Sequence, residues 1–374
     1  MIKTTYYQDM TRLNTFGMKV KARCFVEYDS VADLVDIEFE ELARPVLHIG
    51  GGSNLLFTDD FKGTVLHSKI NFIEILDESL ECHCEDRSTS CHCEERSDVA
   101  ISTPVLVSVG AGVVFDDFCE WAAKEGLWGV ENLSYIPGEV GASAVQNIGA
   151  YGVEVKDVIK TVYCYDTVEE EFVNFDVEDL GYGYRDSAFK DPEIKGRYIV
   201  THVVFALSRT PQPKLDYGHL KEAVDCHFDR AEREEKSLSP ALIRKVIIKI
   251  RKEKLPETSV MGSAGSFFKN PVITAEHFAR IEAAAKAEFG QDYNVPHYDL
   301  PDGMVKVPAA WMIEQCGWKG RRSGGAAVWD KQPLVIVNYT GEAYPEEIIG
   351  LERRIIASVK AKFEIELHPE VEHV

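Results

Sequence analysis

The chain has 374 residues, of which 45% are hydrophobic and 28% are charged, and its formal net charge is −21. This length allows two or three domains, each with its own core. The negative charge argues against nucleic acid or an anionic membrane surface as the main partner. The N-terminus lacks the apolar core of a signal peptide, and no run of about 18 apolar residues occurs. We therefore expect a soluble, cytoplasmic protein that spans no membrane.

The apolar patterns predict alternating strands and helices. Strands are expected at residues 22–28, 46–49, 63–67, 104–109, 158–165, 198–207 and 334–338. Helices are expected around 31–39, at 115–125, from the N-cap Ser239 and Pro240 to Pro256, after Pro308 and after Pro345. Most of the basic residues between Arg244 and Lys254 are expected to face solvent. We place a domain boundary near residues 210–235.

Two glycine-rich stretches are the most informative part of the sequence. The first, Gly50-Gly51-Gly52-Ser53-Asn54, follows an apolar run. The second runs from Pro137 to Glu154, where neither a helical nor a strand period fits. Glycine permits positive φ angles and lets backbone N–H groups approach a ligand closely. One such stretch alone is often only a tight turn, but two on one chain predict a large, phosphate-bearing cofactor.

Five of the nine cysteines are scattered and lie mostly in apolar surroundings, as reduced cysteines do: Cys24, Cys119, Cys164, Cys226 and Cys316.

The other four cysteines lie in a repeat, Cys82-His83-Cys84 followed by Cys91-His92-Cys93. Thiolates and imidazoles are ligands that zinc prefers, but structural zinc sites usually space their cysteines by two to four residues. Acidic residues dominate residues 77–98, with almost nothing apolar, and this composition favours disorder. We expect a flexible, non-catalytic insertion that binds metal only by accident, and a zinc site remains the alternative.

The C-terminal half carries a second chemical signal at residues 262–271. Gly265 allows a turn that exposes Ser266, while Phe267 and Phe268 can anchor this segment in a core. Donors suited to an anionic ligand are Lys254, Lys269, Asn270 and the neighbours Tyr184 and Arg185. Near the C-terminus, Glu370 places a carboxylate in a stretch that would otherwise be a plain tail. Each has a plainer alternative: a structural serine, a surface contact or a solvated carboxylate.

Together these segments resemble the UDP-N-acetylenolpyruvoylglucosamine reductase family, flavoproteins of peptidoglycan precursor synthesis. The resemblance covers nearly the whole chain and rests on ordered blocks at residues 14–17, 50–57, 109–112, 131–133, 137–154, 183–190, 254–256, 262–271, 324–327 and 369–371. It implies an α+β fold that begins with an FAD-binding module of the vanillyl-alcohol-oxidase (PCMH) type, made of two subdomains.

The resemblance divides the chain into an FAD module at residues 1–210, a connecting segment with a substrate loop at 211–235, and a substrate-binding α+β domain at 236–364. Residues 365–374 would return to the active site. The segment 77–103 departs from the family, whose members join those strands by a short turn.

The resemblance also implies a reaction. NADPH reduces non-covalently bound FAD, and a hydride then passes to the vinyl carbon of UDP-N-acetylglucosamine enolpyruvate, giving UDP-N-acetylmuramate. Arg185 and Glu370 resemble the residues that hold the substrate carboxylate. Ser266 resembles the proton donor, and Lys254 is a candidate for activating it. The resemblance implies no metal, and we expect a monomer, although the sequence leaves the oligomeric state and the NADPH-versus-NADH selectivity open.

The binding residues follow from the same blocks. Those implied for FAD are Gly50, Gly51, Gly52, Ser53, Asn54, Gly138, Gly141, Ala142, Ser143, Val145, Ile148 and Gly149. Those implied for the substrate are Tyr151, Tyr184, Tyr217, Lys254, Asn270 and Gln332. Tyr217 would lie on a loop that closes on substrate and marks the longer (type I) form of the family.

Two other functions remain open. One is a different FAD-dependent oxidoreductase of the same fold, such as an oxidase with covalently attached flavin. Those enzymes carry a histidine inside the glycine loop, whereas His48 lies before it here. The other is a metal-binding or interaction protein organised by the Cys-His-Cys repeats.

Overall fold

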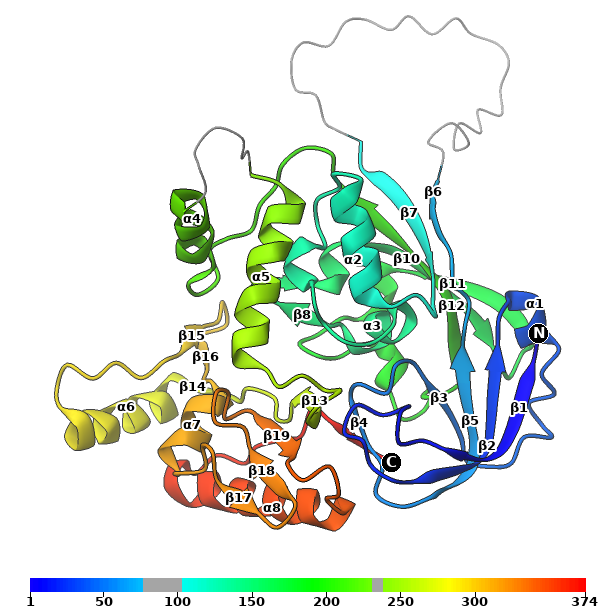
Figure 1. Ribbon diagram of the computed structural model, residues 1–374. Coiled ribbons are helices and arrows are strands. Elements are labelled where there is room, and N and C mark those ends of the chain that lie inside the picture. The colour runs from blue at the N-terminus through cyan, green and yellow to red at the C-terminus, as the bar shows by residue number, and fades with distance from the viewer. Residues whose placement is uncertain (77–102, 231–237) are drawn as a thin grey trace, which may run out of the picture.

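The computed structural model describes residues 1–76, 103–230 and 238–374 (Figure 1). The Cys-His-Cys repeats, and with them nearly all of the segment 77–103, lie outside the described residues. The expectations about that segment therefore stay predictions.

The first sheet contains four strands in the order β1-β2-β5-β3. They are β1 (Lys3–Asp9), β2 (Lys21–Tyr28), β5 (Phe61–Ser68) and β3 (Val46–Ile49). β1 and β2 are antiparallel, whereas β5 runs parallel to both of its neighbours. The predicted helix after β2 is the shorter α1 (Val31–Val35), in which the Ser30 hydroxyl accepts a hydrogen bond from the Asp33 N–H.

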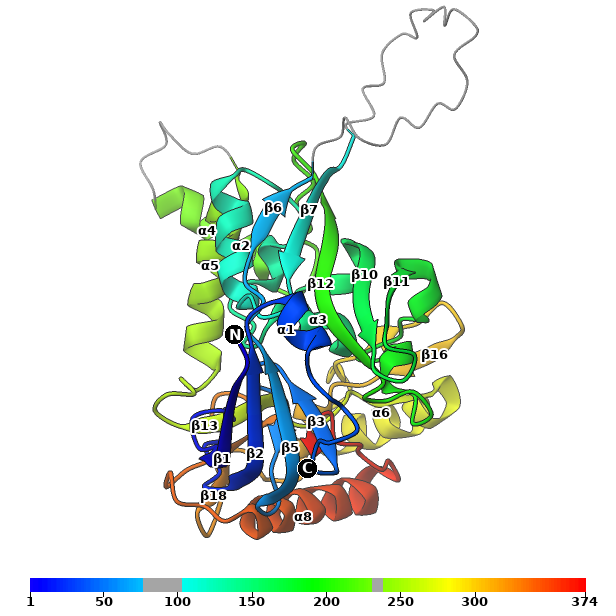
Figure 2. The same ribbon diagram turned by 90° about the vertical axis from the view of Figure 1, so that its right-hand side faces the viewer.

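The second sheet is antiparallel and has the order β11-β10-β12-β7-β6. Its strands are β11 (Glu171–Asp176), β10 (Ile159–Asp166), β12 (Tyr198–Leu207), β7 (Val105–Gly110) and β6 (Ile73–Ile75). Helix α2 (Phe115–Lys124) buries Phe118 against Phe205 of β12, with ring centroids 4.7 Å apart. Figure 2 shows this sheet above the strands of the first sheet.

The second glycine-rich stretch is partly helical, so the expectation of no regular structure there is wrong. It contains α3 (Val140–Gln146) and a small hairpin of β8 (Gly149–Ala150) and β9 (Val153–Glu154). A helix of seven residues is too short to be stable by itself, and tertiary packing stabilises it here. A Cβ atom at Gly141 would lie 2.9 Å from the Ala111 Cβ, so only glycine lets this helix approach that segment so closely.

Helix α5 (Pro240–Lys254) begins as predicted, because the Ser239 hydroxyl accepts a hydrogen bond from the Leu242 N–H. Its buried face packs with Trp128 and with residues of α4 (Leu220–Arg230). It also contacts α2. The helix therefore packs closely on the N-terminal half, while the domain division at residue 236 stays a prediction.

The C-terminal part is α+β. One sheet has the order β13-β19-β18-β17, and a smaller one has the order β14-β16-β15. The strands are β13 (Gly262–Ser266), β14 (Val272–Thr274), β15 (Tyr298–Asp299), β16 (Met304–Lys306), β17 (Arg322–Ser323), β18 (Ala326–Val328) and β19 (Val335–Asn338). The helices are α6 (Ala275–Phe289), α7 (Ala309–Gln315) and α8 (Pro345–Phe363).

The two ends of the fold are joined by packing and by backbone pairing. A single apolar core contains Phe16 and Phe57 together with Phe267, Ile336 and Leu351. The last strand, β20 (Glu372–His373), runs parallel to β4 (Leu55–Leu56), directly after the first glycine loop (Figure 1). The C-terminal segment is thereby fixed next to that loop.

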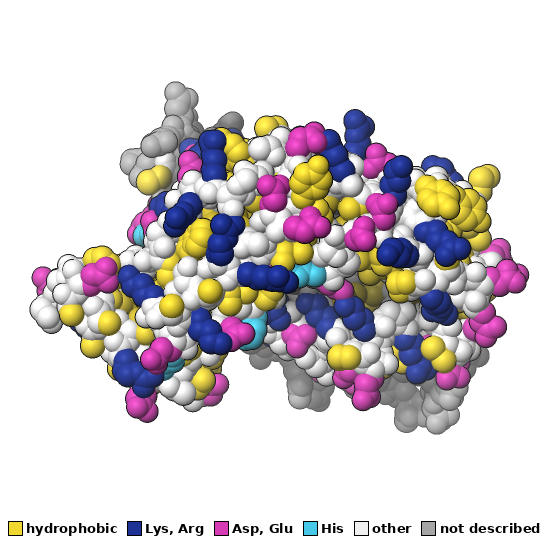
Figure 3. All heavy atoms as spheres, turned by 90° about the horizontal axis from the view of Figure 1, so that it is seen from below, with side chains coloured by type: hydrophobic (Ala, Val, Ile, Leu, Met, Phe, Trp, Pro, Cys, Tyr) yellow, Lys and Arg dark blue, Asp and Glu magenta, His cyan; other side chains and the backbone are white. Residues whose placement is uncertain are grey.

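The face on the side of α8 carries basic and acidic side chains next to one another, with only small apolar areas between them (Figure 3). In the described part of the chain, none of the helices is long and apolar enough to cross a membrane.

Candidate active site

A cavity of about 550 Å³ lies between the two sheets and is lined by both glycine-rich stretches. Its volume is within the usual range for a cofactor or substrate site. All of the predicted FAD residues line it except Gly149. The carbonyl of Gly149 instead accepts a hydrogen bond from Arg185 Nη2 at 2.6 Å. The assignment of these residues to FAD stays a prediction, and Gly149 differs from the others in contacting Arg185.

The glycines are required because the two loops touch through their backbones. A Cβ atom at Gly51 would lie 3.3 Å from the Gly138 Cα, and Ser53 Oγ donates to the Pro137 carbonyl at 3.0 Å. Gly52 has φ +61°, and a Cβ there would lie 2.1 Å from the Leu13 carbonyl oxygen. Both loops therefore bring backbone atoms to the cavity wall, where N–H groups can approach a flat ring or a phosphate.

The two histidines nearest to this wall already have polar partners. His48 Nε2 lies 2.8 Å from the Tyr28 hydroxyl, and His67 Nε2 lies 2.9 Å from Glu139 Oε1. Burial, with a smaller contribution from His67, lowers the pKa of His48 to about 4, so its ring is neutral at physiological pH.

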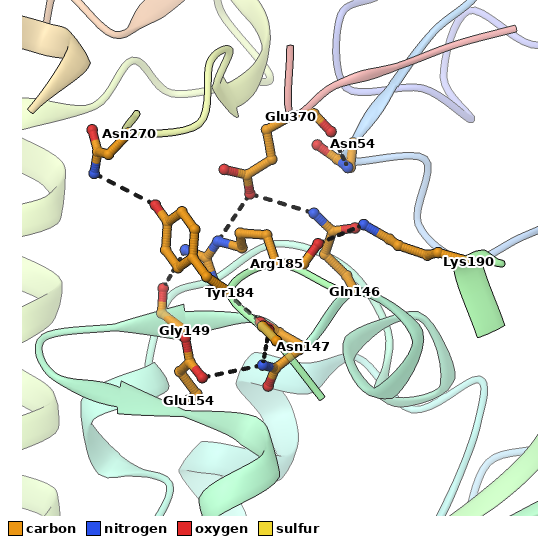
Figure 4. Close-up of polar contacts among 11 residues, drawn as sticks. Asn54, Gln146, Asn147, Gly149, Glu154, Tyr184, Arg185, Lys190, Asn270 and Glu370 are labelled. Atoms are coloured by element: carbon orange, nitrogen blue, oxygen red, sulfur yellow. Dashed lines mark hydrogen bonds and ion pairs between the residues drawn. The ribbon is translucent and has the colours of Figure 1, made fainter. Parts of the chain in front are cut away.

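An arginine–glutamate pair lies beside the cavity (Figure 4). Arg185 Nε is 3.0 Å from Glu370 Oε1, and both side chains are largely buried, with 18% and 11% of their surface exposed. Arg185 Nη1 and Nη2 donate to the carbonyls of Asn147 and Gly149 at 3.2 and 2.6 Å. The guanidinium is thus held in one orientation before any ligand binds.

The backbone around Arg185 is fixed as firmly as its side chain. Arg185 has φ +56° in a turn closed by hydrogen bonds between Gly183 and Asp186. Asn147, the left-handed C-cap of α3, donates from Nδ2 to the Gly183 carbonyl at 2.7 Å. Lys190 Nζ donates to the Arg185 carbonyl at 2.9 Å. The end of α3 therefore positions the turn that presents Tyr184 and Arg185.

Glu370 lies beside Arg185 because its segment is hydrogen-bonded to both halves of the chain. Its N–H donates to the Phe267 carbonyl at 2.8 Å, and its own carbonyl accepts from Asn54 Nδ2 at 3.1 Å. Gln146 Nε2 lies 3.4 Å from the Glu370 carboxylate. Through its backbone Glu370 thus contacts the first glycine loop and the Ser266 segment, and through its carboxylate it contacts α3.

Comparison with known proteins identifies the family. The C-terminal domain model of UDP-N-acetylenolpyruvoylglucosamine reductase matches residues 256–374, and an FAD binding domain model matches residues 98–171. The reductase of Bacteroides fragilis strain YCH46 is 46% identical over 362 residues, covering 96% of this chain and 97% of that protein. The chain belongs to the UDP-N-acetylenolpyruvoylglucosamine reductase family.

Two further members of the family support this assignment and the fold. The reductase of Porphyromonas gingivalis strain ATCC 33277 is 40% identical over 370 residues, covering 98% of this chain and 97% of that protein. The crystal structure of the reductase from Thermus caldophilus covers 100% of this chain and 98% of its own, with 22% identity and a TM-score of 0.60, and so supports the fold. The predicted family, the α+β fold with an FAD-binding module, and the class of FAD-dependent oxidoreductase are confirmed.

The cavity also fits FAD on its own geometry. Close backbone contact between Gly51 and Gly138 leaves main-chain atoms on its wall, and a half-buried ammonium, that of Lys190, faces it. The second glycine loop opens directly onto α3, whose end holds the Arg185 turn. The second glycine-rich stretch is therefore connected through α3 to the turn that carries Arg185.

Ser266 lies at the end of β13, opposite Val335, and is half-buried. In place of the expected turn at Gly265, the strand has a bulge. The register of the β13–β19 pairing shifts between Ser263 and Ser266, and Gly265 has φ +69°. Phe267 and Phe268 are fully buried, as predicted. The bulge changes the direction of Ser266 while the aromatic pair holds its backbone.

Three of the predicted substrate residues are tyrosines close to the Arg185 turn. Asn270 Nδ2 lies 3.4 Å from the Tyr184 hydroxyl, so two predicted residues are in contact. Tyr217 packs edge-on against Tyr151, and its ring stacks on Tyr298 with centroids 6.0 Å apart and an interplanar angle of 10°.

Sequence reasoning missed Tyr298 and its neighbour Lys306. Lys306 Nζ lies 4.8 Å from the Tyr184 ring centroid and 5.7 Å from that of Tyr298, so this cation joins the tyrosines. Neither residue belongs to a glycine-rich or otherwise distinctive segment, and only their position in the fold connects them with the site.

Two predicted residues take little part in these contacts. Lys254 is exposed at the end of α5, and its carbonyl accepts from Trp329 Nε1 at 3.0 Å. Within the described residues, no hydrogen bond joins Lys254 to Ser266. Gln332 Oε1 accepts from the Leu334 N–H at 3.5 Å, within its own turn.

Two basic residues of α5 face the N-terminal half rather than solvent. Arg244 Nη2 donates to Asp116 Oδ2 at 3.0 Å, and Arg251 Nε donates to the Tyr135 carbonyl at 3.1 Å. Burial lowers the pKa of Arg251. Burial also raises the pKa of Tyr151, and the nearby charge of Arg251 partly opposes that rise. Arg251 is thus a cation near the substrate tyrosines that the sequence placed on a solvated face.

Proposed function

We propose that the chain catalyses the NADPH-dependent reduction of UDP-N-acetylglucosamine enolpyruvate to UDP-N-acetylmuramate through FAD, in cytoplasmic peptidoglycan precursor synthesis, and that it acts as a monomer. The observation that carries this proposal is the Arg185–Glu370 pair, 3.0 Å apart at the edge of the glycine-walled cavity. Bound FAD supplies hydride transfer, taking a hydride from NADPH and delivering it to the vinyl carbon of the substrate.

Arg185 holds the carboxylate of the enolpyruvyl group. Hydride addition to the vinyl carbon builds negative charge toward this carboxylate, and donors fixed in advance stabilise such charge most. The carbonyls of Asn147 and Gly149 fix the guanidinium in this way. Glu370 pairs with the same guanidinium. Its carboxyl group lies beside the substrate carboxylate, where it holds a proton or accepts a hydrogen bond.

Ser266 gives a proton to the carbon next to the carboxylate. A serine hydroxyl is a weak acid in water and needs a fixed position and a cationic neighbour to serve as a proton donor. The bulge at Gly265 and the buried Phe267 and Phe268 provide the position. Lys254 lacks a described contact with Ser266, so any activation by it requires its exposed side chain to move when substrate binds.

The sugar and diphosphate are bound by Tyr151, Tyr184, Tyr217, Lys254, Asn270 and Gln332. The hydrogen bond between Tyr184 and Asn270 and the stacked rings of Tyr217 and Tyr298 support this assignment. Phenol and amide groups of this kind suit the hydroxyl and phosphate groups of a sugar nucleotide.

An absorption experiment tests the proposed function. The purified protein should show an oxidised-flavin spectrum that NADPH bleaches without oxygen and that the enolpyruvyl sugar nucleotide restores. Acid precipitation should release the flavin into the supernatant, whereas covalent flavin would stay in the pellet. Bleaching without recovery on that substrate would favour another FAD-dependent oxidoreductase of this fold.

A further inference from the structure

Lys190 ends the short 3-10 helix Ala188–Lys190 and lies between the cavity and the Arg185 turn. Its side chain lines the cavity, and its Nζ donates to the Arg185 carbonyl at 2.9 Å. Figure 4 shows Lys190 reaching toward the Arg185 carbonyl from the side of Gln146 and Asn54. The roles assigned above to Arg185, Ser266 and Glu370 leave this ammonium group unused.

Lys190 differs from the other charged residues on the cavity wall in its direct contacts. Lys195 forms an ion pair with Glu372, and Glu139 is hydrogen-bonded to His67. Within the described residues, Lys190 forms no ion pair and bonds only a neutral carbonyl. Burial, with a smaller contribution from Lys269, lowers the pKa of Lys190, and the carboxylates of Asp186, Glu370 and Glu372 only partly offset this effect. The protein therefore holds a cation where it is costly, and an anion in the cavity would relieve that cost.

Lys190 also lies at the reacting end of the cavity. Asn54 and Gln146 line the cavity, and both contact Glu370. Since Glu370 pairs with Arg185, this is the end where a substrate held by Arg185 meets the cofactor. Hydride transfer to that substrate would require the flavin ring at this end, which would place Lys190 near the part of FAD whose charge changes.

We infer that Lys190 is a further functional residue, whose ammonium group stabilises the negative charge that the flavin ring gains on reduction and so makes bound FAD easier to reduce. The ring takes two electrons and one proton from NADPH as a hydride, leaving NADP⁺, and becomes singly negative. When the hydride leaves, the ring is neutral again. A positive charge in a poorly solvated wall favours the reduced form more than it would in water.

The inference uses the proposed function only to locate the end of the cavity at which the hydride is transferred. Its test therefore uses neither NADPH nor the enolpyruvyl substrate. The midpoint potential of protein-bound FAD is measured by photoreduction in equilibrium with a reference dye, for the wild type and for Lys190→Met. The variant should have a lower potential, with an equilibrium constant for reduction about tenfold smaller. For a two-electron couple this corresponds to about 30 mV.

Three further variants separate charge from structure. Lys190→Arg keeps the charge and should retain most of the wild-type potential. Lys190→Gln keeps a donor for the Arg185 carbonyl but removes the charge, and should lower the potential as Lys190→Met does. Lys62→Met removes a charge from an exposed position of β5 that does not line the cavity, and should leave the potential unchanged.

An unchanged potential in both Lys190→Met and Lys190→Gln would overturn the inference, and Lys190 would then serve only to hold the Arg185 carbonyl. A lowered potential in Lys190→Met that Lys190→Gln restores would overturn it too, because the hydrogen bond would then be the cause. Failure of the enolpyruvyl substrate to reoxidise the wild-type flavin would instead count against the proposed function and leave the potentials interpretable.

Discussion

The guanidinium Nε of Arg185 lies 3.0 Å from the carboxylate Oε1 of Glu370, although one residue follows the glycine-rich cofactor segment and the other stands near the C-terminus. Two backbone carbonyls on one side and the β20–β4 pairing on the other keep this pair together. The site is therefore assembled before substrate arrives, and substitutions in it should affect one half-reaction more than the other.

Arg185→Lys should slow flavin reoxidation by the enolpyruvyl substrate by about 10²–10³-fold. Lysine cannot bond two carbonyls and pair with Glu370 in the planar arrangement of a guanidinium. Stopped-flow absorbance at the oxidised-flavin band measures the step. Arg23→Lys, at an exposed position of β2, is the matched control and should behave as the wild type. A wild-type rate in Arg185→Lys would remove Arg185 from the chemical step.

Ser266→Ala should uncouple the two half-reactions. Loss of a general acid costs about 10²–10⁴-fold in rate, and only the step that needs a proton should suffer. Reduction of FAD by NADPH should stay near the wild-type rate, while reoxidation by the enolpyruvyl substrate slows by that factor. Ser259→Ala, at an exposed serine, is the control. Equal slowing of both half-reactions would mean that Ser266 is structural.

Glu370→Gln should show the same asymmetry as Ser266→Ala, because its carboxyl group faces Arg185 and the substrate site. The amide is similar in size but loses the charge that pairs with Arg185 at 3.0 Å. Single-turnover reoxidation in the same stopped-flow assay measures the loss. A variant that slows only the reduction by NADPH would assign Glu370 to the nucleotide reductant instead.

Gly52→Ala should abolish stable FAD binding. The new Cβ would lie 2.1 Å from the Leu13 carbonyl oxygen, so the loop cannot keep its path. Gly181→Ala is the matched control, because Gly181 also has positive φ but open space around it. The control should lose only about 1–2 kcal/mol of stability from backbone strain and retain its flavin. Flavin content after gel filtration, with thermal unfolding, distinguishes the two, and normal flavin content in Gly52→Ala would contradict the assignment.

Replacing residues 77–103 by a turn of about two to five residues should leave NADPH oxidation intact, since such turns are the usual length for a hairpin. The flanking strands β6 and β7 are antiparallel, with Ile75 opposite Val107, so a short turn can join them. A soluble, flavin-loaded variant without activity would show that the insertion matters and would revive the metal-binding alternative.

The sequence by itself determined the features whose signals are local. Helix α5 begins at Pro240 and stops before Pro256 because a serine cap, a first-turn proline and a terminal proline act within a few residues of one another. Strand β12 has its predicted bounds, Tyr198–Leu207, because this segment is rich in β-branched and aromatic residues. The glycine loops predicted a site for a large cofactor, because glycine has no Cβ and therefore permits positive φ and close backbone contact.

Only the tertiary structure decided what depends on contacts between distant segments. Helix α3 has only seven residues, too few for a stable isolated helix, and it forms where Gly141 packs against Ala111. Arg251 belongs to a basic face that looked solvated, yet it bonds the Tyr135 carbonyl because α5 lies on the N-terminal half. Folding also brings Lys190 to the Arg185 carbonyl and stacks Tyr298 on Tyr217. Propensity and capping act over a turn or two of chain, whereas the surroundings of a charge are set by whichever segments the core brings together.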